Sequence, residues 1–321
     1  MSKIADNIER KSKKEAVEPA IAVVPPNATG EELGKSRCRQ ATRRGADVYL
    51  PTWSAMARIL PNAFLRSALF SAGRRVQAGS ARVLSGDPTL LVAGKEIASF
   101  KNMTLTFSGY ELCQFDRQVY ATCLDYYREM PLSPEESQQH IRTSFYEFTR
   151  RMGGSYGLNT HKAVRASLLR LSFAQLRMRF DRLNLELPKL LAVSFQDGEA
   201  GGDFKGSDML LLRVTVSVAE LFGPGAWTAV DEEAVGYDGL LGWLAAFYAG
   251  HSGPCWLPIV TLHLLSGYES HMGNFKASLV SSLDKLKNEQ TPICSRVSDY
   301  HFSNDGMNLL VIRCNWDARR V

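Results

Sequence analysis

The sequence predicts an α+β fold with two tandem winged-helix domains (helix-turn-helix plus β hairpin) behind a disordered N-terminal arm. One order of elements occurs twice, a glycine-rich turn separates two amphipathic helices, and strand-like segments follow each helix pair. Hydrophobic residues make up 45% and charged residues 22% of the 321 residues, which allows a sizeable core. We divide the chain into an arm (1–46), a lead-in segment (47–102) and winged-helix domains at 103–220 and 221–321.

The elements of the first domain follow from apolar spacing and turn residues. The segment before it, 76–102, is glycine-rich and predicts loop and short strands. Helices are expected over 114–130, 143–152 and 160–172, and strands over 103–107, 174–180, 189–196 and 208–218. The last two of these strands form a hairpin across a loop with four glycines.

The second domain repeats this order. Helices are expected over 232–249, 257–265 and 271–288, followed by strands over 294–302 and 307–314. Asp305-Gly306 between the two strands is a strong hairpin signal. The recurrence of one architecture without evident sequence identity favours a tandem arrangement.

The charge is unevenly distributed along the chain. The net charge is +5 overall, but residues 140–182 carry nine basic and two acidic residues, whereas 183–254 carry three and ten. A basic block within a folded region favours a polyanionic partner, of which nucleic acid is the commonest. The alternative is a solvated basic face balanced by the acidic block that follows it.

Candidate DNA contacts lie on the third helix of each domain and beside it. Val164, Leu168 and Leu171 form the apolar stripe of the first such helix, so its cations point elsewhere. Arginine and asparagine suit base edges, and lysine suits phosphate. The first-domain candidates are Arg150, Arg151, Asn159, Thr160, Lys162, Arg165, Arg170, Arg177 and Arg179, predicted to form one continuous basic surface. The second-domain candidates are Asn274, Lys276, Ser281 and Lys287, of which the first three are expected to supply base readout.

No enzymatic motif is complete, so we expect a protein that is not an enzyme and needs no cofactor or metal. There is no His-x-His pair, Gly-x-Ser-x-Gly elbow or His-Glu-x-x-His segment, and no two cysteines form a Cys-x-x-Cys pair. No apolar stretch is long enough to span a bilayer, and no segment has a signal-peptide core. We therefore expect a cytoplasmic protein.

The chain resembles the TrfA family of plasmid replication initiators over about residues 47–315. Two further stretches that carry the resemblance are 162–171 and 227–286. The most specific segments are Pro-Thr-Trp at 51–53, Pro-Asn at 61–62, Arg-Ser-Ala-Leu-Phe at 66–70, Leu-Thr-Phe-Ser-Gly-Tyr-Glu-Leu at 105–112 and Phe-Tyr-Glu-Phe at 145–148.

The resemblance implies an initiator that binds direct repeats (iterons) at a plasmid origin and promotes melting of an adjacent AT-rich segment. The partners it implies are double-stranded origin DNA, single-stranded AT-rich DNA, the host helicase DnaB and the host initiator DnaA. It also implies a monomer–dimer equilibrium that controls plasmid copy number. Residues 46–50 lack the glutamine and terminal phenylalanine of the family's sliding-clamp peptide, which argues against clamp binding there.

Two other functions fit the same predicted folds. One is a winged-helix transcriptional repressor, which would bind its operator without melting it. The other is an origin-nicking enzyme, against which the missing His-x-His pair argues.

Overall fold

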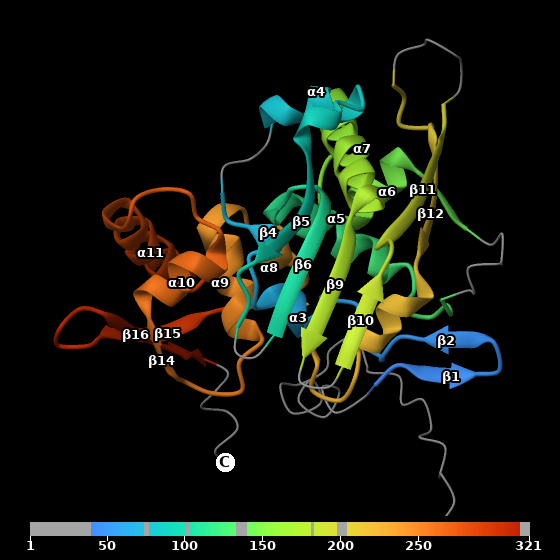
Figure 1. The fold of residues 1–321 in the computed structure, drawn as a ribbon. Helices are drawn as coiled ribbons and strands as arrows, with labels where there is room; N and C mark the ends of the chain where they lie inside the picture. The colour runs from blue at the N-terminus through green and yellow to red at the C-terminus, as the bar shows by residue number, and fades with distance from the viewer. Residues whose placement is uncertain are drawn as a thin grey trace, which may run out of the picture.

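The computed structural model describes residues 40–73, 77–100, 103–132, 140–180, 183–197 and 204–314, and it is a mixed α+β structure (Figure 1). Most of the predicted disordered arm lies outside these residues. Its last part does not: Thr42–Arg44 (β1) pairs antiparallel with Asp47–Tyr49 (β2), so the chain is already in a strand there. None of the helices in the described ranges is both long and apolar enough to cross a lipid bilayer.

The N-terminal unit, residues 114–214, contains three helices, a short strand and a hairpin, with a second hairpin inserted between the third helix and that hairpin. Its helices and strands are α5 (Gln114–Asp125), β8 (Ile141–Ser144), α6 (Phe145–Arg151), α7 (Leu158–Phe173), β9 (Gln175–Phe180), β10 (Leu183–Leu187), β11 (Leu191–Gln196) and β12 (Met209–Val214). The strand order β11-β12-β8 places the second strand of the hairpin between its first strand and β8.

A second sheet lies beside this unit and contains a strand that sequence patterning missed. β9 and β10 form a hairpin between α7 and β11, and β9 also pairs with β6 (Met103–Tyr110). With β5 (Leu91–Ile97) the order is β10-β9-β6-β5. Leu176 and Met178 of β9 are buried whereas Arg177 and Arg179 are exposed, so the sheet has one apolar and one polar face.

The C-terminal unit, residues 232–313, begins with the short helix α8 (Glu232–Val235) and then repeats the arrangement. Its elements are α9 (Gly239–Ala249), β14 (Trp256–Pro258), α10 (Ile259–Ser266), α11 (Met272–Leu286), β15 (Val297–Phe302) and β16 (Asn308–Arg313). The order β14-β16-β15 again places the last strand in the centre. The helix expected over 232–249 is wrong in one respect: it is divided into α8 (Glu232–Val235) and α9, because Gly239 adopts φ of +55°.

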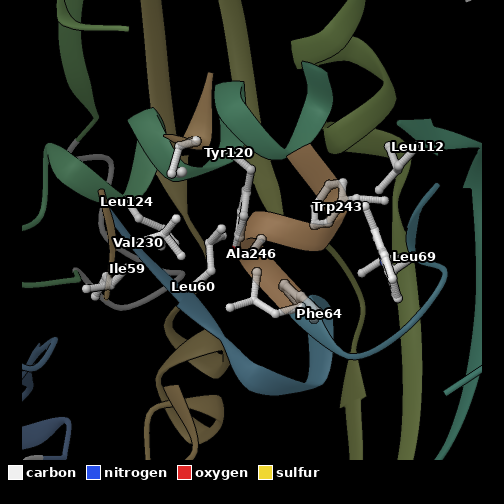
Figure 2. Close-up of a cluster of buried hydrophobic side chains, with 14 of the residues drawn as sticks. Ile59, Leu60, Phe64, Leu69, Leu112, Tyr120, Leu124, Val230, Trp243 and Ala246 are labelled. Carbon is white, nitrogen blue, oxygen red and sulfur yellow. The ribbon is translucent and has the colours of Figure 1, made fainter. Parts of the chain in front are cut away.

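The lead-in segment is built into the cores of both units. β3 (Ala57–Pro61) is buried along its whole length and pairs with β13 (Trp227–Asp231), while β4 (Phe70–Ser71) pairs with β7 (Leu112–Cys113). Between β3 and β4 lies the short helix α3 (Asn62–Leu65). Figure 2 shows side chains of the lead-in segment, of β7 and α5, and of β13 and α9 meeting in one apolar cluster. The labelled residues are Ile59, Leu60, Phe64, Leu69, Leu112, Tyr120, Leu124, Val230, Trp243 and Ala246.

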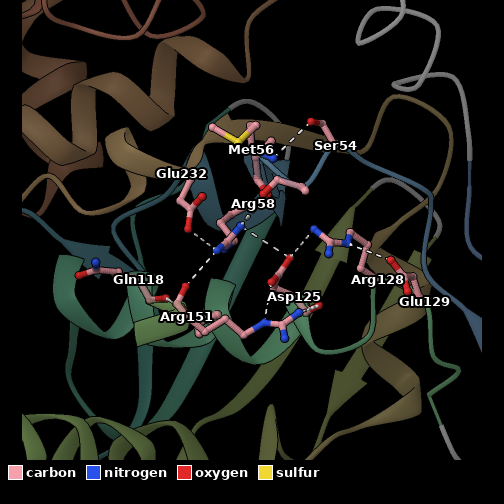
Figure 3. Close-up of polar contacts among 12 residues, drawn as sticks. Ser54, Met56, Arg58, Gln118, Asp125, Arg128, Glu129, Arg151 and Glu232 are labelled. Atoms are coloured by element: carbon pink, nitrogen blue, oxygen red, sulfur yellow. Dashed lines mark hydrogen bonds and ion pairs between the residues drawn. The ribbon is translucent and has the colours of Figure 1, made fainter. Parts of the chain in front are cut away.

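Arg58 on β3 connects the two units through polar contacts (Figure 3). The side chain is 4% exposed, and its Nη2 lies 2.6 Å from Glu232 Oε1 of α8 and donates to Arg151 O of α6 at 3.0 Å. Its Nη1 lies 3.6 Å from Asp125 Oδ1 of α5, whose Oδ2 also accepts from Arg151 Nε at 2.7 Å. A buried arginine needs such partners, so the ends of four elements are held around it.

Arg58→Ala should destabilise the protein by about 3 kcal/mol, because it leaves the buried carboxylate of Asp125 and the partly buried Glu232 with fewer partners. The matched control is Arg43→Ala, whose side chain is 70% exposed and lies 3.8 Å from Glu220, and which should cost less than about 1 kcal/mol. Urea unfolding followed by tryptophan fluorescence measures both. If the wild-type protein unfolded in two separate steps as urea is raised, this would contradict a core that both units share.

Candidate nucleic-acid interface

The N-terminal end of α7 is the accessible part of this helix. Asn159 and Lys162 are exposed, Thr160 is half-buried, and the first residue, Leu158, is 49% exposed. The helix begins after Gly157 without a side-chain cap, so the N–H groups of its first turn remain directed outward. This positive end of the helix dipole suits a phosphate group.

The C-terminal half of α7 is covered, which makes the prediction for Arg170 wrong. The helix α4 (Gln77–Leu84) packs on α7, where the segment 76–102 was expected to contain loop and short strands. Arg170 is 3% exposed, and its Nε and Nη2 lie 3.0 and 2.7 Å from Asp116 Oδ1 of α5. A helical wheel with one apolar stripe does not reveal that a second element covers the opposite flank.

Arg165 faces the hairpin of its own unit instead of open solvent. Its Nη1 and Nη2 lie 2.6 and 3.0 Å from the two carboxylate oxygens of Asp197, which directly follows β11. The guanidinium also lies 4.2 Å from the ring centroid of Phe195. The positive charge of Arg165 is therefore matched within the protein.

The two arginines that end α6 differ in environment. Arg150 is exposed and forms no ion pair with another described residue. Arg151 is bound to Asp125 and lies over the ring of Tyr126, with 4.2 Å from its Cζ to the ring centroid. Arg150 remains available to a ligand, and Arg151 is part of the cluster around Arg58.

Arg177 and Arg179 lie on the polar face of the four-stranded sheet, on β9, which begins two residues after the C-terminal end of α7. Arg177 Nε lies 3.3 Å from Glu186 Oε1, and Arg179 Nε donates to Asn184 Oδ1 at 3.1 Å. Lys162 lies near the other end of α7, a helix of 16 residues and thus about 24 Å long. The predicted single basic surface is consequently split into two.

Sequence reasoning missed Lys205, which lies on the returning arm of the hairpin. It is exposed, and the turn that carries it is held by Lys205 N–H to Asp208 Oδ2 (2.8 Å) and Tyr146 N–H to Gly206 O (2.9 Å). The sequence feature that could have revealed its position is the Gly-Ser-Asp turn that follows this lysine. The returning arm is thereby fixed against the start of α6.

The four candidates on the C-terminal unit point to two different sides of α11. Asn274 and Ser281 line a groove of about 1040 Å³ whose other wall includes Asp238 and Glu269. On the hairpin side, Lys276 Nζ lies 3.4 Å from Gly306 O, within hydrogen-bond range. Lys287 Nζ, also on that side, lies 3.1 Å from Asp299 Oδ1. The charges here are mixed and partly paired.

His161 of α7 joins three elements through ring stacking. It is fully buried between Phe145 of α6 and Phe204 of the hairpin arm, with centroid distances of 3.8 and 4.6 Å and ring planes within 16°. Its Nδ1 lies 3.1 Å from the Tyr156 hydroxyl. Burial lowers the pKa of His161, Asp208 opposes this shift and Arg165 adds to it.

No group of three or more His, Cys, Asp or Glu side chains placed to hold a metal ion occurs in the described part of the chain. The expectations about enzymatic activity and cofactors stay predictions.

The lowered pKa of His161 predicts a pH dependence of stability. The unfolded chain takes up a proton near pH 6.5 more readily than the native state does, so stability falls as the pH drops through this value. His161→Phe keeps the ring stack without the titrating group. Its free energy of unfolding should depend less steeply on pH between about pH 5 and 7 than that of the wild type. If the free energies of unfolding of the wild type and His161→Phe, measured by chemical denaturation, changed equally with pH, this would contradict a buried neutral histidine.

Comparisons with known proteins found similar solved structures, of which two are given below, and no family. No family model matches the sequence, and no curated protein matches it. A crystal structure of a selenomethionine derivative of domains 2 and 3 of RctB is 11% identical, with a TM-score of 0.44 over 69% of this chain and 90% of that chain. A second, of RctB domains 2–3, is 12% identical, with a TM-score of 0.44 over 73% and 96%. We base no functional conclusion on a likeness at this level.

Proposed function

We propose that this protein is a plasmid replication initiator that binds double-stranded origin DNA through two winged-helix units. The observation that carries the proposal is the connectivity that occurs twice. Each unit has a helix, a short strand, two helices across a turn and a hairpin, and the hairpin's second strand pairs with the short strand. In winged-helix proteins the last of these helices is the recognition helix and the hairpin is the wing.

The N-terminal unit supplies the main electrostatic attraction in this proposal. The N-terminal end of α7 presents Asn159 and Lys162, the wing presents Lys205, and the last turn of α6 presents Arg150. Lysine and helix N–H groups contact phosphate, and asparagine contacts base edges. Arg165 and Arg170 are left out of the interface because their charges are bound to Asp197 and Asp116.

The C-terminal unit contributes a recognition helix with a small outer face. Gly273 and Ala277 are exposed in the first turns of α11, where short side chains allow close approach of a duplex. Asn274 and Lys276 lie on either side of them. The paired state of Lys287 and the acidic groove wall are consistent with a smaller share of the electrostatic attraction.

The initiator role rests on the resemblance of the lead-in and core segments to the TrfA family. The Pro61-Asn62 pair has a definite structural role: Asn62 Nδ2 donates to Gly225 O at 2.8 Å, and its Oδ1 accepts from Thr228 Oγ1 at 2.6 Å. We propose that iteron binding melts the adjacent AT-rich DNA and that DnaB and DnaA act at the opened origin. Binding free energy that deforms DNA suffices for melting, so we propose no covalent step.

The combined variant Lys162→Ala/Lys205→Ala should weaken binding to origin repeats and flatten its salt dependence. Each lost phosphate contact lowers the slope of log affinity against log salt by about 0.9. The matched control, Arg177→Ala/Arg179→Ala, removes the same charge from the sheet face and should leave the slope nearly unchanged. Fluorescence anisotropy over a salt series measures both. A larger loss for the sheet variant would place the interface on the sheet.

Melting distinguishes an initiator from a repressor or a nicking enzyme. On supercoiled plasmid carrying the origin, the protein should make thymines of the AT-rich segment reactive to permanganate while leaving both strands intact. Protection of the repeats without permanganate reactivity would indicate a repressor. Nicked DNA with protein attached, formed in the presence of magnesium, would indicate an enzyme. A scrambled repeat array serves as the control.

A further inference from the structure

Arg165 and Asp197 connect the recognition helix α7 to the loop end of the wing's first strand, β11. The two side chains form a bidentate pair, with 2.6 Å for Nη1 to Oδ1 and 3.0 Å for Nη2 to Oδ2. Asp197 is the last described residue before the wing loop, and it directly follows β11. A fork-to-fork pair of this kind fixes direction as well as distance.

The environment of Arg165 holds it in this position. Its side chain is 16% exposed, and its Cζ lies 4.2 Å from the ring centroid of Phe195 and 5.0 Å from that of Phe204. These rings come from the outgoing and returning arms of the wing. The guanidinium also holds the pKa of Asp197 below its ordinary value. To reach a phosphate, Arg165 would have to leave both a carboxylate and two aromatic faces.

The returning arm of the wing has its own attachment to the helices. Phe204 stacks on His161, which stacks on Phe145, so one arm of the wing continues a column of rings through α7 and α6. Gly206 lies against two tyrosines: a Cβ there would come within 3.3 Å of both Tyr146 and Tyr156. Phe145 N–H donates to Asp208 O at 3.0 Å.

We propose that the Arg165–Asp197 pair is a latch that positions the wing relative to α7, and that Arg165 is a positioning residue and not a DNA contact. The proposal rests on the proposed DNA-binding function and assigns roles to two residues within it. The latch orients the wing so that Lys205 and Lys162 meet one duplex together.

The direction in which DNA affinity changes in one variant distinguishes a positioning role from a purely electrostatic effect of Asp197. Asp197 is an acid beside a surface that binds phosphate, so its charge alone repels DNA. Asp197→Asn would therefore strengthen binding if Asp197 had no positioning role or if it only masked Arg165. If the latch positions the wing, the same variant weakens binding although the protein becomes more positive.

The experiment compares Asp197→Asn and Arg165→Lys with Glu186→Gln, which removes the same charge as Asp197→Asn from an exposed site on β10. Affinity for origin repeats is measured at fixed salt. Hydrogen–deuterium exchange of residues 204–212 is measured without DNA. Both latch variants should lose about tenfold in affinity, since Asp197→Asn removes the carboxylate charge and Arg165→Lys removes the bidentate geometry of the pair. Their wing amides should exchange about tenfold faster, whereas Glu186→Gln should match the wild type or bind slightly tighter.

Unchanged exchange in Asp197→Asn and Arg165→Lys would overturn the latch, whatever the DNA measurements give. Tighter binding and a steeper salt slope in Asp197→Asn would also overturn it and make Arg165 a DNA contact. If the wild type itself does not prefer origin repeats to scrambled DNA, the DNA-binding function fails, and the exchange data still decide whether the latch exists. Thermal unfolding of each variant confirms that it is folded.

Discussion

Arg58 lies where four elements meet, and the arrangement of the N-terminal and C-terminal units depends on it. The strand that carries it, β3, comes before both units in sequence, yet it pairs with β13 and is buried along its whole length. A guanidinium in such a place is tolerated when its donors are satisfied, and Glu232, Asp125 and the Arg151 carbonyl satisfy them from both units. The two units therefore share one core, and the lead-in segment is the element that joins them.

Several residues of the segments that most resemble the TrfA family are buried in this shared core. Phe64 and Phe70 contact Tyr120 in the shared core, and Leu105 and Phe107 line the buried face of the four-stranded sheet. Such residues constrain one another through packing. Of the residues that we propose to contact DNA, Lys205 lies outside the stretches that carry the resemblance. Lys162 lies within 162–171, and Asn274 and Lys276 lie within 227–286.

Cationic residues of the N-terminal unit divide into two groups by what surrounds them. Arg58, Arg151 and Arg170 are bound to carboxylates of α5 and α8, and Arg165 is bound to the wing. The remaining cations near the N-terminal end of α7 have no such partner among the described residues. The net charge of a segment therefore overstates the charge that a ligand meets, because ion pairs within the protein neutralise part of it. On the C-terminal unit, the charge of Lys287 is likewise paired within the protein, with Asp299.

The sequence by itself determined the α+β class, the order of helices and hairpins in both units, and the apolar stripe Val164, Leu168 and Leu171, because these depend on local periodicity and turn residues. It did not reveal α4, the inserted strand β10 or the division between α8 and α9. Only the tertiary structure decided which arginines face solvent. Arg165 and Arg170 both lie off the predicted stripe, yet Asp197 and Asp116 meet them from segments 32 and 54 residues away. Contacts of that separation are set by the packing of whole elements, which no local pattern in a single sequence encodes.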